Sequence, residues 1–491
     1  MGGYSPSKMN IPAFLILAQT LFGFNAVFAD VTTSIIASSN YGVWEGWGTS
    51  LAWWAAAFGD RDDLADAVFS LGDVSLNGVT LPGLGMNIVR YNAGATSSNS
   101  INGESIVKSP KVDASRLIDG YWLDWTSSDP ASSSWEWSQD AKQRLMMQKA
   151  KNLGATLFEL FSNSPMWWKL NNHNPSGSND GSSDNLQTWN HQQFAVYLAT
   201  IALYAQNNWG ITFHSVEAFN EPSANWWNGQ SGTQEGCHFA VATQQDVLPY
   251  LRSELNSRGL SSVLISASDE NSYDVAISTW KSLNSTAKAA VGQINVHGYQ
   301  YGNGDRTGLY GQAVDSGKKL WNSEYGESDA TGSQLISNVI LDFRWLHPTA
   351  WVYWQIVDGG GWGLITGDNT ALSLSGPTQK YFILAQLTRH IRPGMRILDS
   401  GCDYAVAAYD TAAHKLVIVA VNWGSAQYLN FDLSQFSTPG QSGTTIRRWS
   451  TQIGSGEQYA TYNDTTLSGA KFWSYFSTNQ VQTFEIPGVV I

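Results

Sequence analysis

Hydrophobic and polar residues follow two different rhythms along this 491-residue chain. From about residue 42 to residue 392, short apolar runs that end in polar or aromatic residues alternate with longer amphipathic stretches. Residues 138–154, 191–210 and 333–348 carry apolar side chains at three- and four-residue spacing and end in Gly or Pro, which predicts helices. The apolar runs predict eight strands, which begin near Glu45, Met86, Leu157, Ser215, Leu264, Ile294, Lys319 and Ala350. This regular alternation predicts an α/β fold, namely a parallel (β/α)8 TIM barrel.

The tail of the chain has another pattern. After residue 392 the helical period disappears, and short alternating runs separated by Gly, Ser, Asn and Pro predict an antiparallel β-sandwich. Residues 30–38 are also strand-like and could join that sheet. We therefore predict a barrel over residues 42–392 and a β-sandwich side domain over residues 30–41 plus 393–491.

The first 29 residues are set apart from the fold. An apolar stretch over residues 11–28 precedes Ala29, and small or modest residues stand where a signal peptidase cleaves. Polar Gln19, Thr20 and Asn25 interrupt a stretch that barely reaches the ~20 residues of a membrane span, so the alternative of an anchor is disfavoured. We predict a signal peptide over residues 1–29 and a secreted, extracellular protein.

The amino-acid composition limits the kinds of ligand that this protein can bind. The chain has 27 basic and 40 acidic residues, a net charge of −13, which is the wrong sign for binding nucleic acid or an anionic membrane. Charged residues make up only 14%, whereas Trp numbers 23, Tyr 20 and Phe 19. Flat aromatic faces with a polar edge suit the stacking of sugar rings. These numbers favour a carbohydrate ligand.

Motifs for other chemistries are missing from the sequence. It contains neither a Cys-x-x-Cys nor a His-Glu-x-x-His zinc motif, and neither a phosphate loop nor a Gly-x-Ser-x-Gly elbow. We therefore predict no cofactor and no metal. Cys237 and Cys402 could form one disulfide or remain two thiols.

Two carboxylates stand at predicted strand ends. Glu221 ends the fourth strand in AFNEP, and Glu324 ends the seventh in WNSEYG. A lone glutamate there could form a salt bridge or cap a helix, but the C-terminal ends of barrel strands share one rim. Glycosidic hydrolysis needs two such groups, one to protonate the leaving oxygen and one to attack or stabilise the anomeric carbon.

Longer motifs extend this interpretation over nearly the whole chain after the signal segment. Eight segments resemble, in the same order, segments of glycoside hydrolase family 30. They are EGWGTSLAWWA, LGMNIVRYNAGA, FSNSPMWWK, FNEP, SASDE, VHGYQ, WNSEYG and YFILAQLTRHIRPG. The resemblance implies a (β/α)8 barrel with a β-sandwich side domain that packs on it as a structural unit. It also implies hydrolysis with retention. Residues 219–239, together with SLAWWA, look most like the fungal endo-β-1,6-galactanases.

The resemblance implies roles for individual residues. Glu221 matches the acid/base and Glu324 matches the nucleophile. Arg90 would hold the nucleophile's charge, because a guanidinium favours an ionised carboxylate. Asn220 would bind the sugar 2-hydroxyl through its amide.

Aromatic and imidazole groups are also implied. His297 and Tyr299 would line the floor beside Glu324. Trp168 and Trp354 would stack on the sugar. From the residues alone, Trp354 could instead belong to the barrel core and His297 could be a hydrogen-bonded core histidine.

The loop after the eighth strand bears on the substrate. Residues 358–369 contain no Lys or Arg, whereas related glucuronoxylanases are expected to hold a glucuronate with a basic residue there. An uncharged main chain is favoured, although Arg306 could still meet an acidic side group. We predict a monomeric, retaining endo-β-1,6-galactanase that acts on galactan side chains. The alternatives are a β-1,6-glucanase or xylanase of the same family and a non-catalytic, lectin-like barrel.

Overall fold

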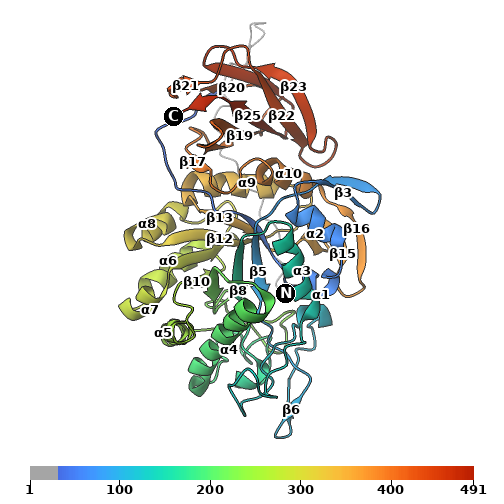
Figure 1. Cartoon of the computed structure of the whole chain (residues 1–491), viewed down its shortest axis with the longest axis vertical. Coiled ribbons are helices and arrows are strands. Elements are labelled where there is room, and N and C mark those ends of the chain that lie inside the picture. Colours follow the sequence, from blue (N-terminus) through green and yellow to red (C-terminus); the bar gives the residue numbers. More distant parts are fainter. Residues whose placement is uncertain (1–30) are drawn as a thin grey trace, which may run out of the picture.

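The computed structural model describes residues 31–491, so the predicted signal segment lies outside the described residues. Eight strands form a closed barrel, with a strand-rich side domain at one end of the molecule (Figure 1). The prediction of an α/β barrel is confirmed. Round the barrel the strands are β2 (Gly46–Ser50), β5 (Ile88–Asn92), β8 (Leu157–Phe161), β9 (Ser215–Glu217), β10 (Leu264–Glu270), β11 (Gln293–His297), β12 (Lys319–Tyr325) and β13 (Ala350–Tyr353).

All eight strands run parallel, and β13 pairs with β2 to close the ring, with Val352 opposite Gly48. Every residue of β5 and β11 is buried. Continuous burial is expected where helices cover the outside of a barrel and side chains fill its inside. The ends of these strands therefore form a rigid platform for the residues that follow them.

Helices cover the barrel. In α9, Leu335, Ile336, Val339 and Ile340 form the buried face, which is the three- and four-residue spacing of an amphipathic helix. Helices α4 and α9 each continue into a short π-helical turn, at Ala205–Trp209 and Asp342–Leu346. The helices are α1 (Trp54–Phe58), α2 (Asp62–Phe69), α3 (Ala141–Asn152), α4 (His191–Tyr204), α5 (Val241–Ser257), α6 (Tyr273–Ser282), α7 (Ser285–Ala290), α8 (Arg306–Ser316), α9 (Ser333–Leu341) and α10 (Gln379–Thr388).

The side domain is built on two facing sheets, and a two-stranded sheet of β21 (Thr438–Pro439) and β26 (Val489–Val490) adds to them. Phe431 and Phe472 of the smaller sheet contact Phe484 of the larger one, with ring centroids 5.4 and 5.1 Å away. The smaller sheet has the order β1 (Val31–Ser34), β20 (Gln427–Asp432), β24 (Lys471–Phe476), and the larger has β17 (Arg396–Leu398), β18 (Ala405–Asp410), β19 (Lys415–Asn422), β25 (Gln480–Pro487), β22 (Thr445–Gln452), β23 (Ala460–Thr466).

Three of these strands, the short β17 and the longer β23 and β24, were not predicted from the sequence. In β23 most residues are polar and exposed. In β24 the buried and exposed positions alternate strictly, but aromatic residues occupy both kinds of position. Hydrophobic residues therefore do not mark the buried positions of β23 and β24, and the sequence shows no alternation of apolar and polar residues from which a strand could be predicted.

Helix α10 joins the two parts of the molecule (Figure 1). All ten of its residues are buried. On the barrel side, the Tyr381 hydroxyl donates to the carbonyl oxygen of Ala67 at 2.8 Å. On the side-domain side, Gln386 Nε2 donates to Thr451 Oγ1 at 2.8 Å, and Gln386 O accepts from Thr483 Oγ1 at 2.8 Å. The side domain is thus held in a fixed position on the barrel.

The structure also describes the two cysteines and the lengths of the helices. Cys237 is a buried thiol and Cys402 a half-buried one, so the structure contains no disulfide between them. Within residues 31–491, every helix is too short or too polar to cross a membrane.

Candidate active site

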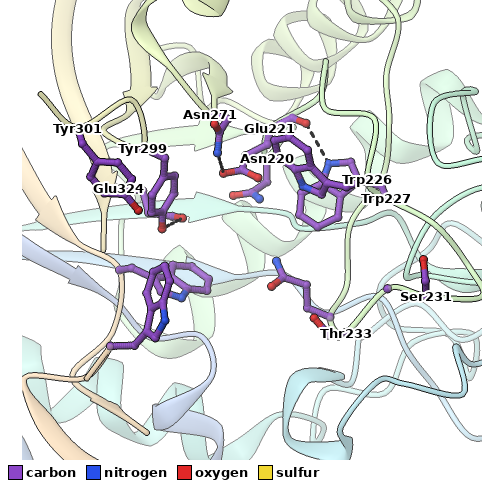
Figure 2. A pocket seen from close by; sticks show the side chains of 14 residues that line it. Asn220, Glu221, Trp226, Trp227, Ser231, Thr233, Asn271, Tyr299, Tyr301 and Glu324 are labelled. Carbon is purple, nitrogen blue, oxygen red and sulfur yellow. Dashed lines mark hydrogen bonds between the residues drawn. The ribbon is translucent and has the colours of Figure 1, made fainter. Parts of the chain in front are cut away.

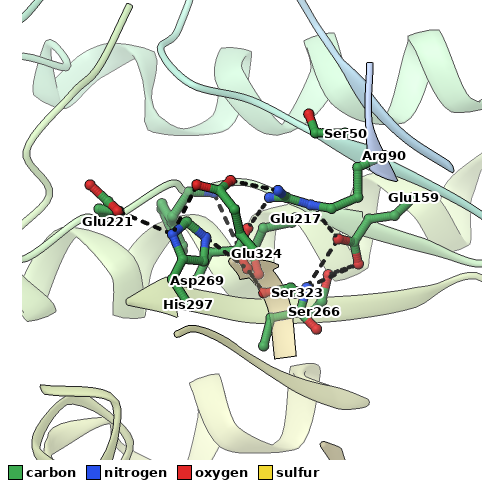
Figure 3. A network of polar contacts seen from close by, with 12 residues as sticks. Ser50, Arg90, Glu159, Glu217, Glu221, Ser266, Asp269, His297, Ser323 and Glu324 are labelled. Atoms are coloured by element: carbon green, nitrogen blue, oxygen red, sulfur yellow. Dashed lines mark hydrogen bonds and ion pairs between the residues drawn. The ribbon is translucent and has the colours of Figure 1, made fainter. Parts of the chain in front are cut away.

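The candidate catalytic residues lie at the C-terminal ends of the barrel strands. Arg90 lies in β5, His297 ends β11, Glu324 lies in β12, and Glu221 follows β9 by four residues. Asp269, in β10, completes the group. Parallel strands point their ends to one rim, so residues far apart in sequence meet there (Figure 3).

The two glutamates lie close together. His297 Nδ1 is 3.1 Å from Oε1 of Glu221 and 3.4 Å from Oε1 of Glu324. One oxygen from each glutamate and this nitrogen all lie within 4.8 Å of one another. A carboxyl separation of roughly 6.5–9.5 Å is needed to admit an attacking water. The shorter spacing is compatible with direct attack by one of the carboxylates.

Arg90 organises the floor of the site. Its guanidinium is fully buried and donates from Nη1 to Glu324 Oε2 at 2.7 Å, from Nη2 to Asp269 Oδ2 at 2.6 Å and from Nε to Glu159 Oε1 at 3.2 Å (Figure 3). Burial opposes its charge, but the carboxylates of Asp269, Glu324 and Glu159 raise the pKa of Arg90. Arg90 therefore remains a cation and fixes the direction of the Glu324 carboxyl.

His297 is a second buried cation. Burial opposes its protonation, but the negative charges of Glu324 and Asp269 raise the pKa of His297 to about 10. Its Nε2 is 3.5 Å from Asp269 Oδ1, and its Nδ1 faces both glutamates. Glu221, His297 and Glu324 are spaced so that they could surround a metal ion. A protonated imidazole cannot ligate a metal, so this geometry fits a hydrogen-bonded ion cluster better.

Glu221 is held by its backbone as well as its side chain. It adopts a positive φ of 49°, which is uncommon for a residue with a side chain. Its N–H donates to the carbonyl oxygen of Asp269 at 2.8 Å, and its carbonyl oxygen accepts from Trp227 Nε1 at 2.9 Å. Asn271 Nδ2 donates to its Oε1 at 2.8 Å. These contacts fix an unusual conformation that presents the carboxyl to the cleft.

Glu324 is surrounded by donors. Besides the contact with Arg90, its Oε1 accepts from the Tyr299 hydroxyl at 2.8 Å. Burial raises the pKa of Glu324, and the charges of His297 and Arg90 oppose that rise. The donors stabilise the carboxylate form, which is the form that can act as a nucleophile.

A cleft of about 570 Å³ opens above the two glutamates (Figure 2). Its walls are largely aromatic, which suits the stacking of sugar rings. Asn220 lies at its base, and its Oδ1 has no hydrogen-bond partner among residues 31–491, so this amide is available to a ligand. The aromatic wall residues are Trp226, Trp227, Tyr299, Tyr301, Trp354 and Trp362.

Most of the predicted site residues meet at this cleft. Asn220, Tyr299 and Trp354 line it with Glu221 and Glu324. Arg90 and His297 lie just beneath and contact the glutamates. His297 is therefore not an ordinary core histidine, since its partners are the site carboxylates.

Trp168 lies elsewhere. It is buried, its Nε1 donates to the carbonyl oxygen of Trp122 at 2.8 Å, and Lys169 Nζ lies 3.8 Å from its ring centroid. It is not among the residues that line the cleft. The structure thus places Trp168 within the loop that follows β8, packed on Trp122, and not where it could stack on a sugar in the cleft.

The expectation for Arg306 is wrong. This residue is buried, and its Nε donates to Asp342 Oδ1 at 2.8 Å while its Nη2 donates to Asn338 Oδ1 at 2.9 Å. Its guanidinium ties α8 to the π-helical turn that follows α9. It is not exposed to meet an acidic side group of a substrate.

The long loop after β9 carries cleft residues that were not singled out from the sequence. Trp226, Thr233 and Gln234 all line the cleft. The loop is anchored by buried Glu235, which accepts from the backbone N–H of Ile118 at 2.9 Å and from Asn92 Nδ2 at 3.2 Å. The signal that could have found this wall is the pair Trp226-Trp227 in an otherwise polar segment of the sequence.

The arrangement has the parts needed to cleave a glycosidic bond. One buried carboxyl accepts hydrogen bonds from a guanidinium and a phenol hydroxyl, and a second carboxyl lies close beside it at the base of an aromatic cleft. The pair can supply a nucleophile and a proton donor to the same bond.

Comparisons with known proteins agree with this chemistry. The model of O-glycosyl hydrolase family 30 matches residues 26–293. An endo-beta-1,6-galactanase from Hypocrea rufa is 61% identical over 475 residues, which cover 97% of this chain and 98% of that protein. A conserved exported protein from Bacteroides fragilis superposes with a TM-score of 0.74 at 17% identity, over 93% of this chain and 100% of the other. The catalytic domain of a GH30 xylanase C from Talaromyces cellulolyticus has a TM-score of 0.68 at 18% identity, over 93% and 99%.

Proposed function

Because the chain belongs to O-glycosyl hydrolase family 30, we propose that it is an endo-β-1,6-galactanase that hydrolyses β-1,6-linked galactan chains with retention. The observation that carries this proposal is the near full-length, 61% identity to a protein of that name, combined with an intact pair of glutamates. The small separation of the two carboxyls supports the retaining route over the inverting one.

In the first step a Glu324 oxygen attacks the anomeric carbon. The bond between that carbon and the leaving oxygen breaks, its electron pair stays on the leaving oxygen, and Glu221 protonates that oxygen. The product is an ester between the sugar and Glu324. In the second step Glu221 takes a proton from water, the water oxygen attacks the anomeric carbon, and Glu324 leaves as a carboxylate.

The surroundings of the two glutamates support this division of roles. Arg90 contacts Glu324, and the Tyr299 hydroxyl also donates to Glu324, which favours its anion. Within residues 31–491, both side-chain hydrogen bonds to Glu221 reach Oε1. Its Oε2 is therefore left to carry the proton to the leaving oxygen.

The charge of the cleft supports an uncharged substrate. The residues that line it include no Lys, Arg or His, and the loop of residues 358–369 also lacks Lys and Arg. Buried Lys380 does approach this loop, but its Nζ is used by the carbonyl oxygens of Glu327 and Gly361. A neutral galactan chain meets no unpaired charge in such a cleft.

The setting of the enzyme completes the proposal. The signal segment, residues 1–29, would direct the protein outside the cell, where it would act as a monomer on a polysaccharide. We divide the chain into a catalytic barrel over residues 42–392 and a side domain over residues 30–41 plus 393–491. Pairing of β1 with β20 and of Ile36 with Asp399 supports placing the first described strand in the side domain.

A panel of polysaccharides tests the substrate. Release of reducing ends should be fastest from β-1,6-galactan and slower from β-1,6-glucan and glucuronoxylan. Internal cleavage should shorten the galactan early, when few reducing ends have formed. Faster release from glucuronoxylan or β-1,6-glucan would overturn the proposed substrate, and release of only terminal sugars would overturn the endo mode.

A further inference from the structure

The smaller sheet of the side domain turns aromatic side chains to solvent. In β24, Phe472, Ser474 and Phe476 point inward and are buried, whereas Trp473 and Tyr475 point outward and are each 52% exposed. Neighbouring Tyr428, in β20, is 45% exposed. We call Tyr428, Trp473, Tyr475 and Asn430 the outer aromatic face.

Strand register brings these residues together. Tyr428 lies opposite Tyr475, with ring centroids 5.4 Å apart, and Asn430 lies opposite Trp473. Trp473 and Tyr475 are two residues apart on one strand, which separates them by about 7 Å. The rings therefore lie on one surface beside an amide that can donate and accept hydrogen bonds.

The fold does not need these rings for its core. The space between the two sheets is filled by Phe431, Phe472 and Phe484. Clustered aromatic exposure on the opposite side costs solvation free energy and marks a binding surface more often than scattered exposure does. The outer aromatic face is therefore a candidate for a ligand.

Charge and area indicate which ligand fits. The next pair along these strands, Asp432 and Lys471, is an ion pair at 3.3 Å, so these two charges beside the face compensate each other. Three half-exposed rings offer roughly 300 Å² of apolar surface, well below the ~800 Å² per partner of a stable protein interface. A single neutral polysaccharide chain suits this small surface, whose four residues carry no charge, better than a second protein does.

The face is also built rigidly. It lies on paired β-strands, and α10 fixes the side domain to the barrel through hydrogen bonds on both sides. Its chemistry repeats that of the cleft, where indole and phenol rings are combined with amides. A polymer held on this face would stay at a constant distance from the catalytic glutamates.

We propose that the outer aromatic face is a second carbohydrate-binding site, which holds the neutral polysaccharide outside the cleft by stacking on Trp473, Tyr475 and Tyr428. The identity of the polymer as β-1,6-galactan rests on the proposed function. The site itself contributes no catalytic group, so it acts on long chains and leaves the cleavage of short ones unchanged.

Affinity electrophoresis in gels that contain β-1,6-galactan, β-1,6-glucan or glucuronoxylan tests the site. The binding assay uses the Glu324→Gln background so that the polymer is not cut. The double variant Trp473→Ala/Tyr475→Ala should weaken retention in galactan about five- to tenfold. The matched control is Trp189→Ala, which removes an indole that is 71% exposed on the barrel. This control should not change retention.

Further measurements separate binding from folding. In the active enzyme, the double variant should cleave a short β-1,6-galacto-oligosaccharide at a rate within about twofold of the wild-type rate. Its melting temperature should equal that of the wild type. Trp473→Phe, which keeps an aromatic ring, should retain most of the polymer binding. Unchanged retention of the double variant, or an equal loss with short and long substrates, would overturn the site. A wild-type dimer that dissociates in the double variant would show that a second copy is the occupant, which also overturns it.

The outcomes also separate this site from the proposed function. If wild-type enzyme cleaves galactan but retention does not depend on the outer aromatic face, only the second site fails. If the wild type instead cleaves β-1,6-glucan or glucuronoxylan, and the double variant loses retention in that polymer, the second site stands and the proposed substrate fails.

Discussion

The floor and the walls of the cleft are built in different ways. On the floor, Arg90, Asp269, His297 and Glu324 come from four different strands, and their charges are paired at distances from 2.6 to 3.5 Å. The walls come from loops, and Trp226, in the loop after β9, is 48% exposed. The floor is buried and charged, whereas the walls are aromatic, partly exposed and uncharged.

This difference indicates that the floor and the walls of the cleft have different roles in catalysis and in substrate binding. Strand register and buried ion pairs can hold reacting groups within a fraction of an ångström, which catalysis requires. Loops can change their length and side chains without disturbing the barrel, which suits the choice of sugar and linkage. We expect substitutions on the floor to affect every substrate and substitutions on the walls to affect only the binding of long ones.

The largest effect should come from the floor. Glu324→Gln should lower the turnover number by about 10⁴-fold or more on every substrate, because an amide cannot form the covalent intermediate. Reducing-sugar release from galactan and aryl release from an activated aryl galactoside measure the loss. A variant that loses activity on the polymer but keeps it on the aryl galactoside would contradict the nucleophile assignment.

The variant to compare with Glu324→Gln is Glu221→Gln. It should cost about 10²- to 10⁴-fold on galactan and less on an aryl galactoside, whose leaving group needs little protonation. Added azide should restore its turnover by replacing the base-assisted water. If azide instead rescues Glu324→Gln with inverted product while Glu221→Gln stays inactive, the two roles are exchanged.

A second effect on the floor concerns pH. Burial disfavours the His297 cation, but Glu324, Asp269 and Glu221 raise the pKa of His297 to about 10, above the ordinary value of about 6.5. Its protonation therefore stabilises the fold fully below about pH 6.5, and this contribution is lost as pH rises through 10. Chemical denaturation should show the free energy of unfolding falling by more than about 1 kcal/mol between pH 6.5 and pH 9.5. His297→Gln should flatten this decline, and equal slopes for the two proteins would refute the assignment.

The smallest effect should come from the wall. Trp226→Ala should raise KM for galactan about three- to tenfold, the loss of one stacked ring, and leave kcat within about twofold. Steady-state kinetics on galactan measures both constants. Trp125→Ala is the control, because Trp125 is equally exposed but does not line the cleft. An equal rise in KM for both variants, or a fall in kcat alone, would remove the distinction between floor and wall.

The floor could be predicted because strand ends are visible in the sequence. Short apolar runs place Glu221 and Glu324 at strand ends, and a closed parallel barrel then leaves them only one rim to share. Arg90 and His297 lie on strands that were predicted in the same way, so their meeting with the glutamates follows from the same geometry.

The walls and the outer face could not be predicted in this way. Whether a loop tryptophan faces a cleft or packs behind it depends on distant contacts, as Trp168 and Trp226 show by their opposite placements. The guanidinium of Arg306 is hydrogen-bonded to Asp342, which is remote in sequence, so its burial could not be predicted from the local pattern. In β24, aromatic residues at both inward and outward positions conceal the strand period.

The complete burial of α10 has a consequence for modular exchange. Because Tyr381 bonds to the barrel and Gln386 bonds to the side domain, the helix belongs equally to both parts. A chimera cut at the end of the barrel would replace one of the two surfaces that cover the helix and expose its apolar residues. Recombination among relatives should therefore preserve α10 together with its neighbours on both sides, α9 of the barrel and β22 and β25 of the side domain, as one inherited block.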